Sequence, residues 1–527
     1  MHLLATPQGA PIVDDGVAID LAQTPGDVIF LSAADTEIAC LAAARARIDD
    51  PSFPTVRLAN VLSLGHNMSV DLYVDAMVAR ARLVIVRLLG GRAYWPYGVE
   101  QIAGACQAAA IPLAFLPGDD APDPELARLN TLDAASTHRL WQYCVHGGVD
   151  NARNFLDFAA NVIGHEAAYH EPQPLLRAGI YWPGRPLPNL ADLRADWVAG
   201  APVAALVFYR ALVQAGNLEA VDALINELDD AGLNALPVYV TGLKDPVAAA
   251  TTGALLEAAR PGIVLNATGF AASKPGEARV PSPLEAAGAP ILQVVFASSD
   301  EETWRKGTSG LTPRDIAMNV ALPEIDGRIL GRAVAFKGRG RRDPLTEADL
   351  PSHRPVVDRV AFVCALAANW ARLAATPRKK RRVALVLANY PNRDGRMGNG
   401  VGLDTPASAV HALKALNEAG YKVRGIPADG DALMRKLAAG ATNDWRALSG
   451  RRIEETYDAD EYGRFFARLP AAVRARVLTR WGKPQDDPAY IERDGGGRFA
   501  IPAFRCGSVV VALQPARGYN IDPAESY

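Results

Sequence analysis

The chain has 527 residues, a formal net charge of −3 and a sequence pI of about 6.3, so no strong overall field draws it to nucleic acid or to an anionic membrane. This length exceeds one hydrophobic core and predicts roughly three domains at ~150 residues each, and 49% hydrophobic with 21% charged residues is typical of a folded globular chain. The cysteines are scattered and form no CxxC pair, which predicts reduced thiols. The amino terminus has no secretory signal and no apolar run is long enough to span a bilayer, so the protein is predicted to be cytoplasmic.

Residues 1–125 are predicted to form an α/β domain. Short apolar runs alternate with amphipathic stretches, which is the pattern of βαβ units and a parallel sheet. Asp35 is the predicted N-cap of a helix over residues 36–48, and Ser69 that of a helix over residues 70–81. The predicted strands are residues 27–33, 55–61, 82–90 and 112–118.

The rest of the chain repeats this alternation twice. Residues 126–175 are predicted to be a helical connector, 176–300 a second α/β domain, 301–377 a linker with a helix, and 378–527 a third α/β domain. The predicted strands are residues 178–182, 235–241, 262–268 and 290–298 in the second domain, and 383–389 and 508–513 in the third. The expected fold class is therefore α/β and multidomain, with several doubly wound (Rossmann- or flavodoxin-like) parallel-sheet domains joined by helical connectors.

The segment from Asn389 to Ser408 concentrates glycines and polar side chains. It follows a predicted strand and enters a helix predicted to begin near Thr405, and open α/β sheets bind ligands at the carboxyl ends of their strands. Its four glycines allow close approach of the backbone to a ligand. The polar and charged residues of the segment include Asn392, Arg393, Arg396, Asn399 and Asp404. This combination predicts a binding loop.

A second polar segment, Leu513 to Asp522, leaves the last predicted strand. Arg517 and Tyr519 suit the edge and the face of a flat ligand. An ordinary strand exit with a solvated arginine is the alternative interpretation.

No GxxxxGK[ST] phosphate loop occurs in the sequence. Gly398, Gly400 and Gly402 also lack the spacing of a GxGxxG dinucleotide turn. Any use of ATP is therefore predicted to lie in partner proteins.

Two runs of the first domain, Ser69 to Tyr73 and Leu88 to Gly98, complete a pattern with these two segments. The whole chain resembles the family of large subunits of aerobic cobaltochelatase (CobN), which is related to the magnesium chelatase H subunit, and the first-domain runs favour the cobalt branch. Members of this family continue well past the position of Tyr527. The resemblance, and the open strand exit at the end of the chain, imply a front portion that lacks later chelation residues and is inactive alone.

The resemblance implies a reaction and partners. The reaction is insertion of Co²⁺ into hydrogenobyrinic acid a,c-diamide in aerobic cobalamin biosynthesis. Co²⁺ is the substrate metal, and ATP is hydrolysed by the partner subunits CobS and CobT rather than bound here.

Metal insertion requires a slot for an acid-bearing macrocycle, a proton acceptor and a site for Co²⁺. Guanidinium groups pair bidentately with carboxylates, so Arg393, Arg396 and Arg517 are predicted to anchor the ring periphery. The full set of predicted substrate-binding residues is Arg92, Tyr94, Trp95, Asn392, Arg393, Arg396, Asn399, Gly400, Gln514, Arg517 and Tyr519. Asp404 and Asp522 are the candidate proton acceptors, with a catalytic role.

Histidine is a natural ligand of Co²⁺, and His66 and His146 occur in polar, loop-like settings. For each, a hydrogen-bonded structural histidine is the alternative. Three other functions stay open: a non-catalytic tetrapyrrole-binding or scaffold protein, a magnesium-chelatase H-type subunit acting on protoporphyrin, and an unrelated small-ligand α/β protein.

Overall fold

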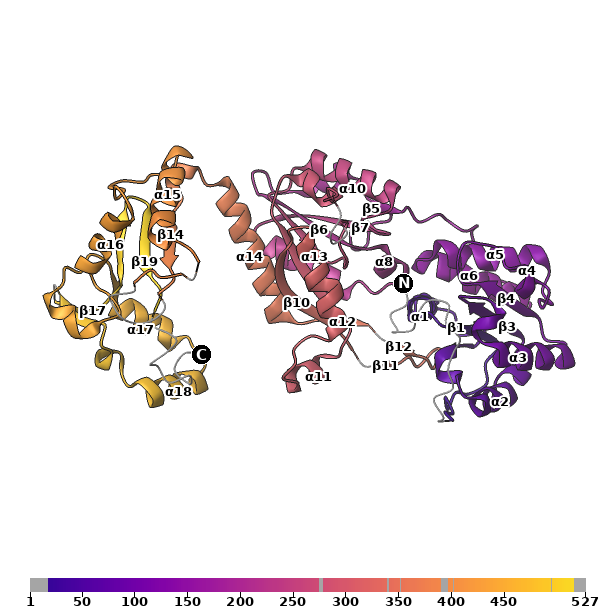
Figure 1. The fold of residues 1–527 in the computed structure, drawn as a ribbon. Coiled ribbons are helices and arrows are strands. Elements are labelled where there is room, and N and C mark those ends of the chain that lie inside the picture. Colours follow the sequence, from indigo (N-terminus) through magenta and orange to yellow (C-terminus); the bar gives the residue numbers. More distant parts are fainter. Residues whose placement is uncertain are drawn as a thin grey trace. The chain divides into compact units, whose positions relative to one another are not determined.

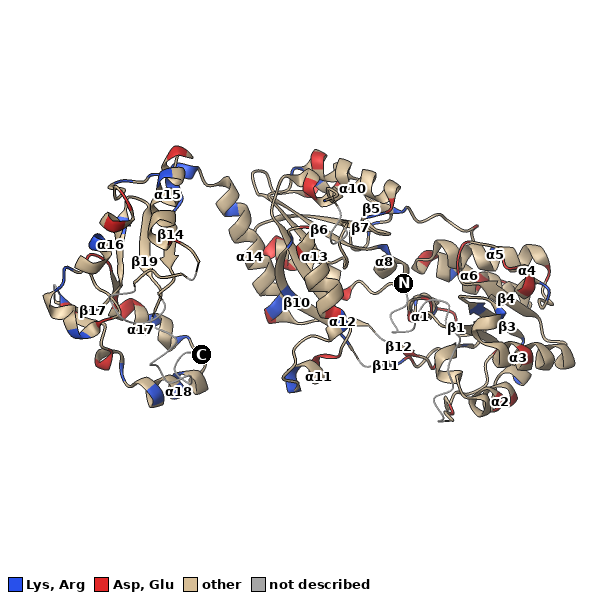
Figure 2. Cartoon of the chain, in the orientation of Figure 1, with Lys and Arg blue, Asp and Glu red and all other residues tan. Residues whose placement is uncertain are grey.

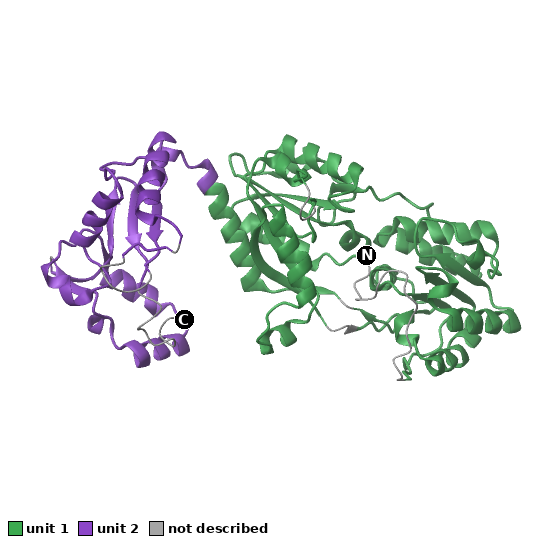
Figure 3. Cartoon of the chain, in the orientation of Figure 1, with its two compact units in different colours: residues 1–372 green, residues 373–527 purple. Residues whose placement is uncertain are grey.

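The computed structural model describes residues 18–273, 278–338, 341–350, 352–389, 397–400, 402–493 and 495–515. The chain divides into two compact units, Met1–Arg372 and Leu373–Tyr527 (Figure 1; Figure 3). Both units are mixed α/β, as the alternating pattern predicts.

The first sheet of unit 1 is parallel, with the strand order β2-β1-β3-β4. Its strands are β1 (Val28–Ser32), β2 (Val56–Asn60), β3 (Leu83–Leu88) and β4 (Leu113–Pro117), each within two residues of its predicted bounds. Successive side chains of β1 point to opposite faces, because a strand has a period of two. Phe30 packs against Phe155 of helix α6 at a centroid distance of 5.6 Å, while Ile29 and Leu31 join the core of the other face.

Helices cover both faces of this sheet, which buries the apolar side chains of each strand (Figure 1). One face carries α1 (Asp35–Arg45), α5 (Ala134–His146) and α6 (Val149–Val162), and the other carries α2 (Asn67–Ala76) and α3 (Pro96–Ala109). The short α4 (Pro124–Ala127) follows β4. Within the predicted helical connector, residues 126–175, α5 and α6 pack on the first sheet, and residues 165–175 form no helix.

The predicted N-caps Asp35 and Ser69 are wrong. Ala34 occupies the N-cap position of α1, and Asp35 instead accepts from Asn60 Nδ2 at 2.7 Å. His66 caps α2 through its side chain, and the Ser69 hydroxyl accepts from the Ile19 N–H at 2.7 Å.

The second sheet of unit 1 has the strand order β13-β10-β9-β8-β6-β7-β5, with antiparallel strands only at its two edges. Its strands are β5 (Ala178–Ile180), β6 (Val203–Tyr209), β7 (Asn234–Val240), β8 (Ile263–Asn266), β9 (Ile291–Ala297), β10 (Ile329–Lys337) and β13 (His353–Pro355). The longer helices around it are α7 (Leu190–Asp196), α8 (Arg210–Gln214), α9 (Glu219–Asp230), α10 (Pro246–Ala259) and α14 (Val357–Ala375). Helices α9 and α14 pack on one face and α10 on the other.

Residues 301–377 were predicted to be a linker with a helix, and this prediction is wrong because the range belongs to the second sheet. It contributes β10 and β13 to the second sheet, together with α11 (Glu301–Lys306), α12 (Pro313–Ile316), α13 (Leu322–Ile325) and the expected helix, α14. The first two residues of β10 are exposed, and a glycine and an arginine follow them, which hides the strand in the sequence pattern. The small hairpin of β11 (Arg341–Arg342) and β12 (Asp349–Leu350) contacts the first sheet, where Arg57 pairs with Glu347 at 3.1 Å.

Unit 2 contains two small sheets, ordered β14-β19-β18 and β15-β17-β16. Their strands are β14 (Val383–Leu387), β15 (Thr456–Asp458), β16 (Tyr490–Arg493), β17 (Gly496–Ala500), β18 (Ala503–Cys506) and β19 (Val509–Leu513). The helices are α15 (Thr405–Glu418), α16 (Gly430–Ala439), α17 (Ala459–Ala467) and α18 (Ala471–Trp481). Leu413 of α15 and Leu433 of α16 share a core with Val511 of β19.

Basic and acidic residues are interspersed along the surface helices (Figure 2). In α11, for example, Arg305 pairs with Glu301 at 2.7 Å one turn away. No helix in the described part of the chain combines the length and apolar character needed to cross a bilayer.

Candidate functional site

The two polar segments predicted from the sequence leave neighbouring strands of unit 2. Strands β14 and β19 are parallel, with Leu387 opposite Leu513, so their carboxyl ends lie at one edge of the sheet. The Gln514 N–H continues the ladder and donates to the Leu387 carbonyl oxygen at 2.9 Å. The segments that begin at Asn389 and at Gln514 therefore start side by side, where open α/β sheets bind ligands.

Two buried side chains, one after β14 and one at the start of α15, each have a polar atom without a hydrogen-bond partner. Asn389 follows β14 and is 1% exposed, and Thr405 begins α15 and is 8% exposed. Asn389 Oδ1 and Thr405 Oγ1 make no hydrogen bond. Most buried polar atoms in native proteins are paired, so these two atoms are available to a water molecule or a ligand.

Glycines keep the backbone close to these atoms. A Cβ added to Gly400 would lie 2.9 Å from Thr405 Oγ1, too close for any other residue without a shift, and Gly398 has a φ of +65°. Gly400 also bridges to Leu403, which turns the chain back towards α15. Glycine at 398 is thus favoured by its backbone conformation, and a side chain at 400 would require Thr405 Oγ1 to move.

Asp404 is the N-cap of α15 and is exposed. Its Oδ1 accepts from the Ala407 N–H at 3.0 Å, and among the described residues no partner is recorded for Oδ2. Asn399 lies between the two glycines discussed above, and the Gln514 carbonyl oxygen accepts from Asn443 Nδ2 at 2.9 Å. Unit 2 therefore contains four of the predicted site residues. Three precede α15, namely Asn399, Gly400 and Asp404, and Gln514 follows β19.

Six of the predicted site residues lie outside the described residues, so their predicted roles stay predictions. They are Asn392, Arg393, Arg396, Arg517, Tyr519 and Asp522.

The predicted ligand-binding role of Tyr94 and Trp95 does not fit the structure. Both are 3% exposed and lie in the core beneath α2 and α3. The Trp95 indole N–H donates to the Leu64 carbonyl oxygen at 3.1 Å, and its ring fills the space in which a Cβ on Gly98 would stand. Arg92 is half exposed and lies 3.8 Å from Glu125. The aromatic run stabilises the first domain by burial rather than by offering a ring face.

His66 and His146 do not form a metal centre with other ligands in the described ranges, where no cluster of three or more His, Cys, Asp or Glu side chains is placed to hold an ion. His66 Nδ1 accepts from the Met68 N–H at 3.0 Å and so caps α2. His146 ends α5. Burial, and then the charge of Arg210, lower the pKa of His146, which favours the neutral ring.

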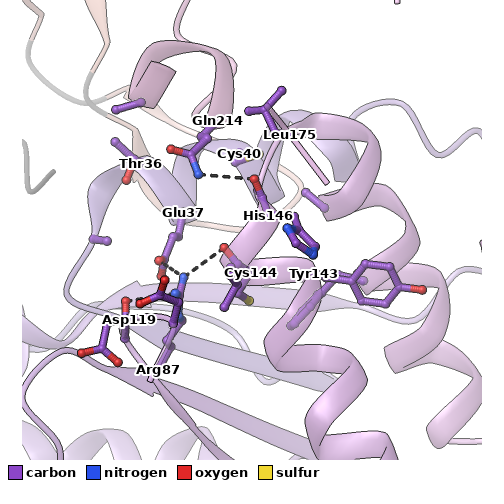
Figure 4. Close-up of a pocket in the computed structure, with 18 of the residues that line it drawn as sticks. Thr36, Glu37, Cys40, Arg87, Asp119, Tyr143, Cys144, His146, Leu175 and Gln214 are labelled. Carbon is purple, nitrogen blue, oxygen red and sulfur yellow. Dashed lines mark hydrogen bonds and ion pairs between the residues drawn. The ribbon is translucent and has the colours of Figure 1, made fainter. Parts of the chain in front are cut away.

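His146 lines a hollow of about 600 Å³ within unit 1 (Figure 4). The wall contains residues from the carboxyl ends of β1, β3 and β4 of the first sheet, and of β6 and β7 of the second. This volume lies in the ~300–1,000 Å³ range of small-molecule sites. The sequence analysis predicted only His146 among the lining residues.

Arg87 organises the first-sheet wall of the hollow, although it is only 5% exposed. Its guanidinium donates to the Pro117 and Gly118 carbonyl oxygens at 3.0 Å each, to the Cys144 carbonyl oxygen at 3.4 Å, and to Glu37 (Figure 4). Arg87 therefore joins β3 to the end of β4, to α5 and to α1. With this many partners its role is structural.

Arg210 and Thr241, on the opposite wall, were also missed by the sequence analysis. Thr241 directly follows β7, whose predicted strand ended at that residue, so the carboxyl-end rule offered a signal. Arg210 follows β6, a strand that the sequence analysis did not predict, and so no signal pointed to it.

Comparison with known proteins adds to this geometry. Residues 141–527 match the family described as CobN/Magnesium Chelatase. The chain is 47% identical over 535 residues to the aerobic cobaltochelatase subunit CobN of Sinorhizobium sp, covering 100% of this chain and 41% of that protein. It is 44% identical over 529 residues to the protein of the same name from Pseudomonas aeruginosa, covering 100% of this chain and 42% of that protein.

A solved structure gives the same likeness. The catalytic subunit of cobaltochelatase from Mycobacterium tuberculosis superimposes with a TM-score of 0.72 at 30% identity, over 95% of this chain and 40% of that one. The chain thus spans about two fifths of the length of the curated relatives that it matches.

Proposed function

The chain belongs to the CobN/magnesium chelatase family, and from this premise we propose that it holds the tetrapyrrole in the large subunit of a cobaltochelatase. The proposed reaction is ATP-driven insertion of Co²⁺ into hydrogenobyrinic acid a,c-diamide, on the aerobic route to cobalamin. Co²⁺ is a substrate in this proposal, and ATP hydrolysis belongs to the partner subunits CobS and CobT. The absence of a phosphate loop from the sequence supports that division.

One observation carries the assignment of the ring to unit 2. The glycine segment and the segment after Gln514 leave adjacent parallel strands at the same edge, so both are available to one ligand. A flat macrocycle needs contacts along two sides, and in this proposal the two segments that follow β14 and β19 provide them. The arginines proposed to anchor its carboxylates, Arg393, Arg396 and Arg517, belong to these two segments of the sequence.

The unpaired atoms at this edge suit the amide substituents of the proposed substrate. Asn389 Oδ1 accepts hydrogen bonds, and the Thr405 hydroxyl both donates and accepts. A primary amide offers both an N–H donor and a carbonyl acceptor, so it can pair with either atom. Side-chain rotations at binding surfaces are common and would bring the two atoms into contact with a bound ring.

Metal insertion also requires removal of protons from ring nitrogens. Asp404 is the proposed acceptor, because Oδ1 is engaged at the helix N-terminus while Oδ2 has no recorded partner among the described residues. Asp522 is the second candidate from the sequence. A proton acceptor must lie within hydrogen-bond reach of the proton that it removes.

A fluorescence titration tests the proposed substrate class. Quenching of tryptophan emission is followed as the 527-residue chain is mixed with hydrogenobyrinic acid a,c-diamide or with protoporphyrin. We expect tighter binding of the corrin precursor. Preference for protoporphyrin would instead support a magnesium-chelatase H-type role, and no response to either compound would remove the ring-binding proposal.

Arginine variants test the proposed anchors. Arg396→Ala and Arg517→Ala should each weaken ring binding by about 1.5–3 kcal/mol, the value of a charge-assisted hydrogen bond. Arg505→Ala is the matched control, since Arg505 lies on β18 of the same sheet and pairs with Glu455 at 2.6 Å. Unchanged affinity in the two test variants would eliminate these residues as anchors.

A further inference from the structure

The hollow in unit 1 contains a second pair of unpaired polar atoms. Arg210 directly follows β6 and Thr241 directly follows β7. These strands are parallel neighbours, with Tyr209 opposite Val240, so the two residues lie side by side at the carboxyl edge of the second sheet. Both line the hollow, and Arg210 Nε and Thr241 Oγ1 are buried without a hydrogen-bond partner.

The Arg210 guanidinium is held in place although Nε is unpaired. Its Nη2 donates to the Leu175 carbonyl oxygen at 2.9 Å and to the His146 carbonyl oxygen at 3.3 Å. Gln214, one turn further along α8, donates to the same His146 oxygen at 3.3 Å (Figure 4). A fixed guanidinium loses little conformational freedom when a ligand binds, which favours its use as an anchor.

The charges of the wall favour an anion near Arg210. Glu37 is neutralised by Arg87, and Arg177 pairs with Asp245 at 2.6 Å. Asp119 and Asp120 also line the hollow, but both are exposed to solvent. Arg210 is therefore a half-buried cation of the wall for which no carboxylate partner is recorded among the described residues.

The position of the hollow agrees with a ligand site. Strand ends of the first sheet form one wall, and strand ends of the second sheet form the other. Ligands of open α/β sheets bind outside the carboxyl ends of the strands, and here two such edges meet. The hollow lies entirely within unit 1, whereas the proposed ring site lies in unit 2.

We propose that this hollow is a second ligand site, which takes a small molecule whose anionic oxygen binds the Arg210 guanidinium and the Thr241 hydroxyl. A carboxylate and a phosphate share this chemistry. Arg210 supplies the charge from its fixed position, and rotation of the Thr241 side chain brings a neutral donor beside it to the ligand oxygen.

Calorimetric titration of the whole chain in Tris buffer, with succinate in one arm and inorganic phosphate in the other, tests the proposal. We expect at least one of the two to bind with a Kd of about 1 mM or tighter. Binding of succinate alone identifies a carboxylate ligand, and binding of phosphate alone identifies a phosphate ligand. Failure of both to bind in this range overturns the proposal.

Thr241→Val locates the binding. The substitution removes the hydroxyl, which has no partner in the free protein, so the fold should be unaffected. Affinity for the anion should fall about tenfold. Ser299→Ala is the matched control, because Ser299 Oγ is another buried, unpaired hydroxyl of unit 1 that does not line the hollow.

A second variant and a ring-binding control complete the test. Arg210→Gln should abolish anion binding, and its thermal unfolding is compared with that of wild type, since Arg210 also holds two carbonyl oxygens. Anion affinity unchanged in Thr241→Val would overturn the proposal. A loss of hydrogenobyrinic acid a,c-diamide binding in Thr241→Val would also overturn it, because the hollow would then be part of the ring site.

Discussion

The first-sheet wall of the hollow in unit 1 and the edge of β14 and β19 in unit 2 both lie at carboxyl ends of parallel strands, yet their polar groups differ. Arg87 donates to three carbonyl oxygens and a carboxylate. Asn389 Oδ1 and Thr405 Oγ1 have no partner. An unpaired buried polar atom destabilises a protein, so the second arrangement fits the ligand site that we propose, whereas the first holds secondary structure together. Hydrogen-bond saturation therefore separates structural polar residues from candidate binding residues.

The largest expected effect of this comparison is on Arg87. Arg87→Leu leaves Glu37 without its partner and three carbonyl oxygens without a donor, so the stability of the first domain should fall by about 3–5 kcal/mol. Hydrogen exchange of the β1 and β3 amides measures this local free energy of unfolding.

Arg47→Leu is the control for loss of an arginine from the same domain. Arg47 and Asp150 form an exposed pair at 3.5 Å, with side chains 61% and 91% exposed, and such pairs contribute at most about 1 kcal/mol. Equal effects of the two substitutions would contradict a structural role for the Arg87 network.

A second hydrogen-bonded buried residue, His353, makes the stability of unit 1 depend on pH. His353 lies on β13, and Nδ1 accepts from Asn217 Nδ2 at 3.2 Å. Burial, followed by the charge of Lys337, lowers the pKa of His353 from 6.5 to about 4. The unfolded chain therefore binds more protons than the folded chain between these values, so acid favours unfolding in this window.

The expected loss is about 2–3 kcal/mol as the pH falls from 6.5 to 4, and it should be fully developed below pH 4. Urea unfolding of wild type and of His353→Gln across this range isolates the contribution of His353 to stability, since all other titratable groups are common to both proteins. A variant with the same pH slope as wild type would show that His353 is not responsible.

The smallest expected effects on stability come from substitution of two buried threonines. Thr252 Oγ1 donates to the Ala248 carbonyl oxygen at 2.7 Å within α10, whereas Thr405 Oγ1 has no partner. Thr252→Val should reduce the local stability of α10 by about 1 kcal/mol, and Thr405→Val should leave α15 within about 0.5 kcal/mol of wild type. Hydrogen exchange of the two helices provides both values, and a larger loss in Thr405→Val would reveal a structural role at the proposed ring site.

The sheets could be predicted from the sequence where their strands are buried on both faces. β1 to β4 are almost continuous apolar runs, and parallel strands covered by helices have this pattern. β10 was missed because its first two residues are exposed and the next two, Gly331 and Arg332, interrupt the apolar run. β6 is equally apolar, so its sequence contained the same strand signal although it was not predicted.

The candidate sites depend on long-range contacts that sequence order does not show. Both segments at the unit 2 edge were predicted, but their adjacency follows from the pairing of β14 with β19, which are more than a hundred residues apart. Trp95 was predicted to face a ligand because the sequence of a loop does not show whether an aromatic side chain in it is buried or exposed. Arg87 stands within an apolar strand, and only its contacts with β4, α1 and α5 reveal its role.

Hydrogen exchange of the whole chain with and without hydrogenobyrinic acid a,c-diamide tests most directly whether the ring binds at the edge of β14 and β19. The ring should protect amides at residues 397–405 and 513–515, and leave those around Arg210 and Thr241 unchanged. Protection confined to unit 1, or none in unit 2, would contradict the account.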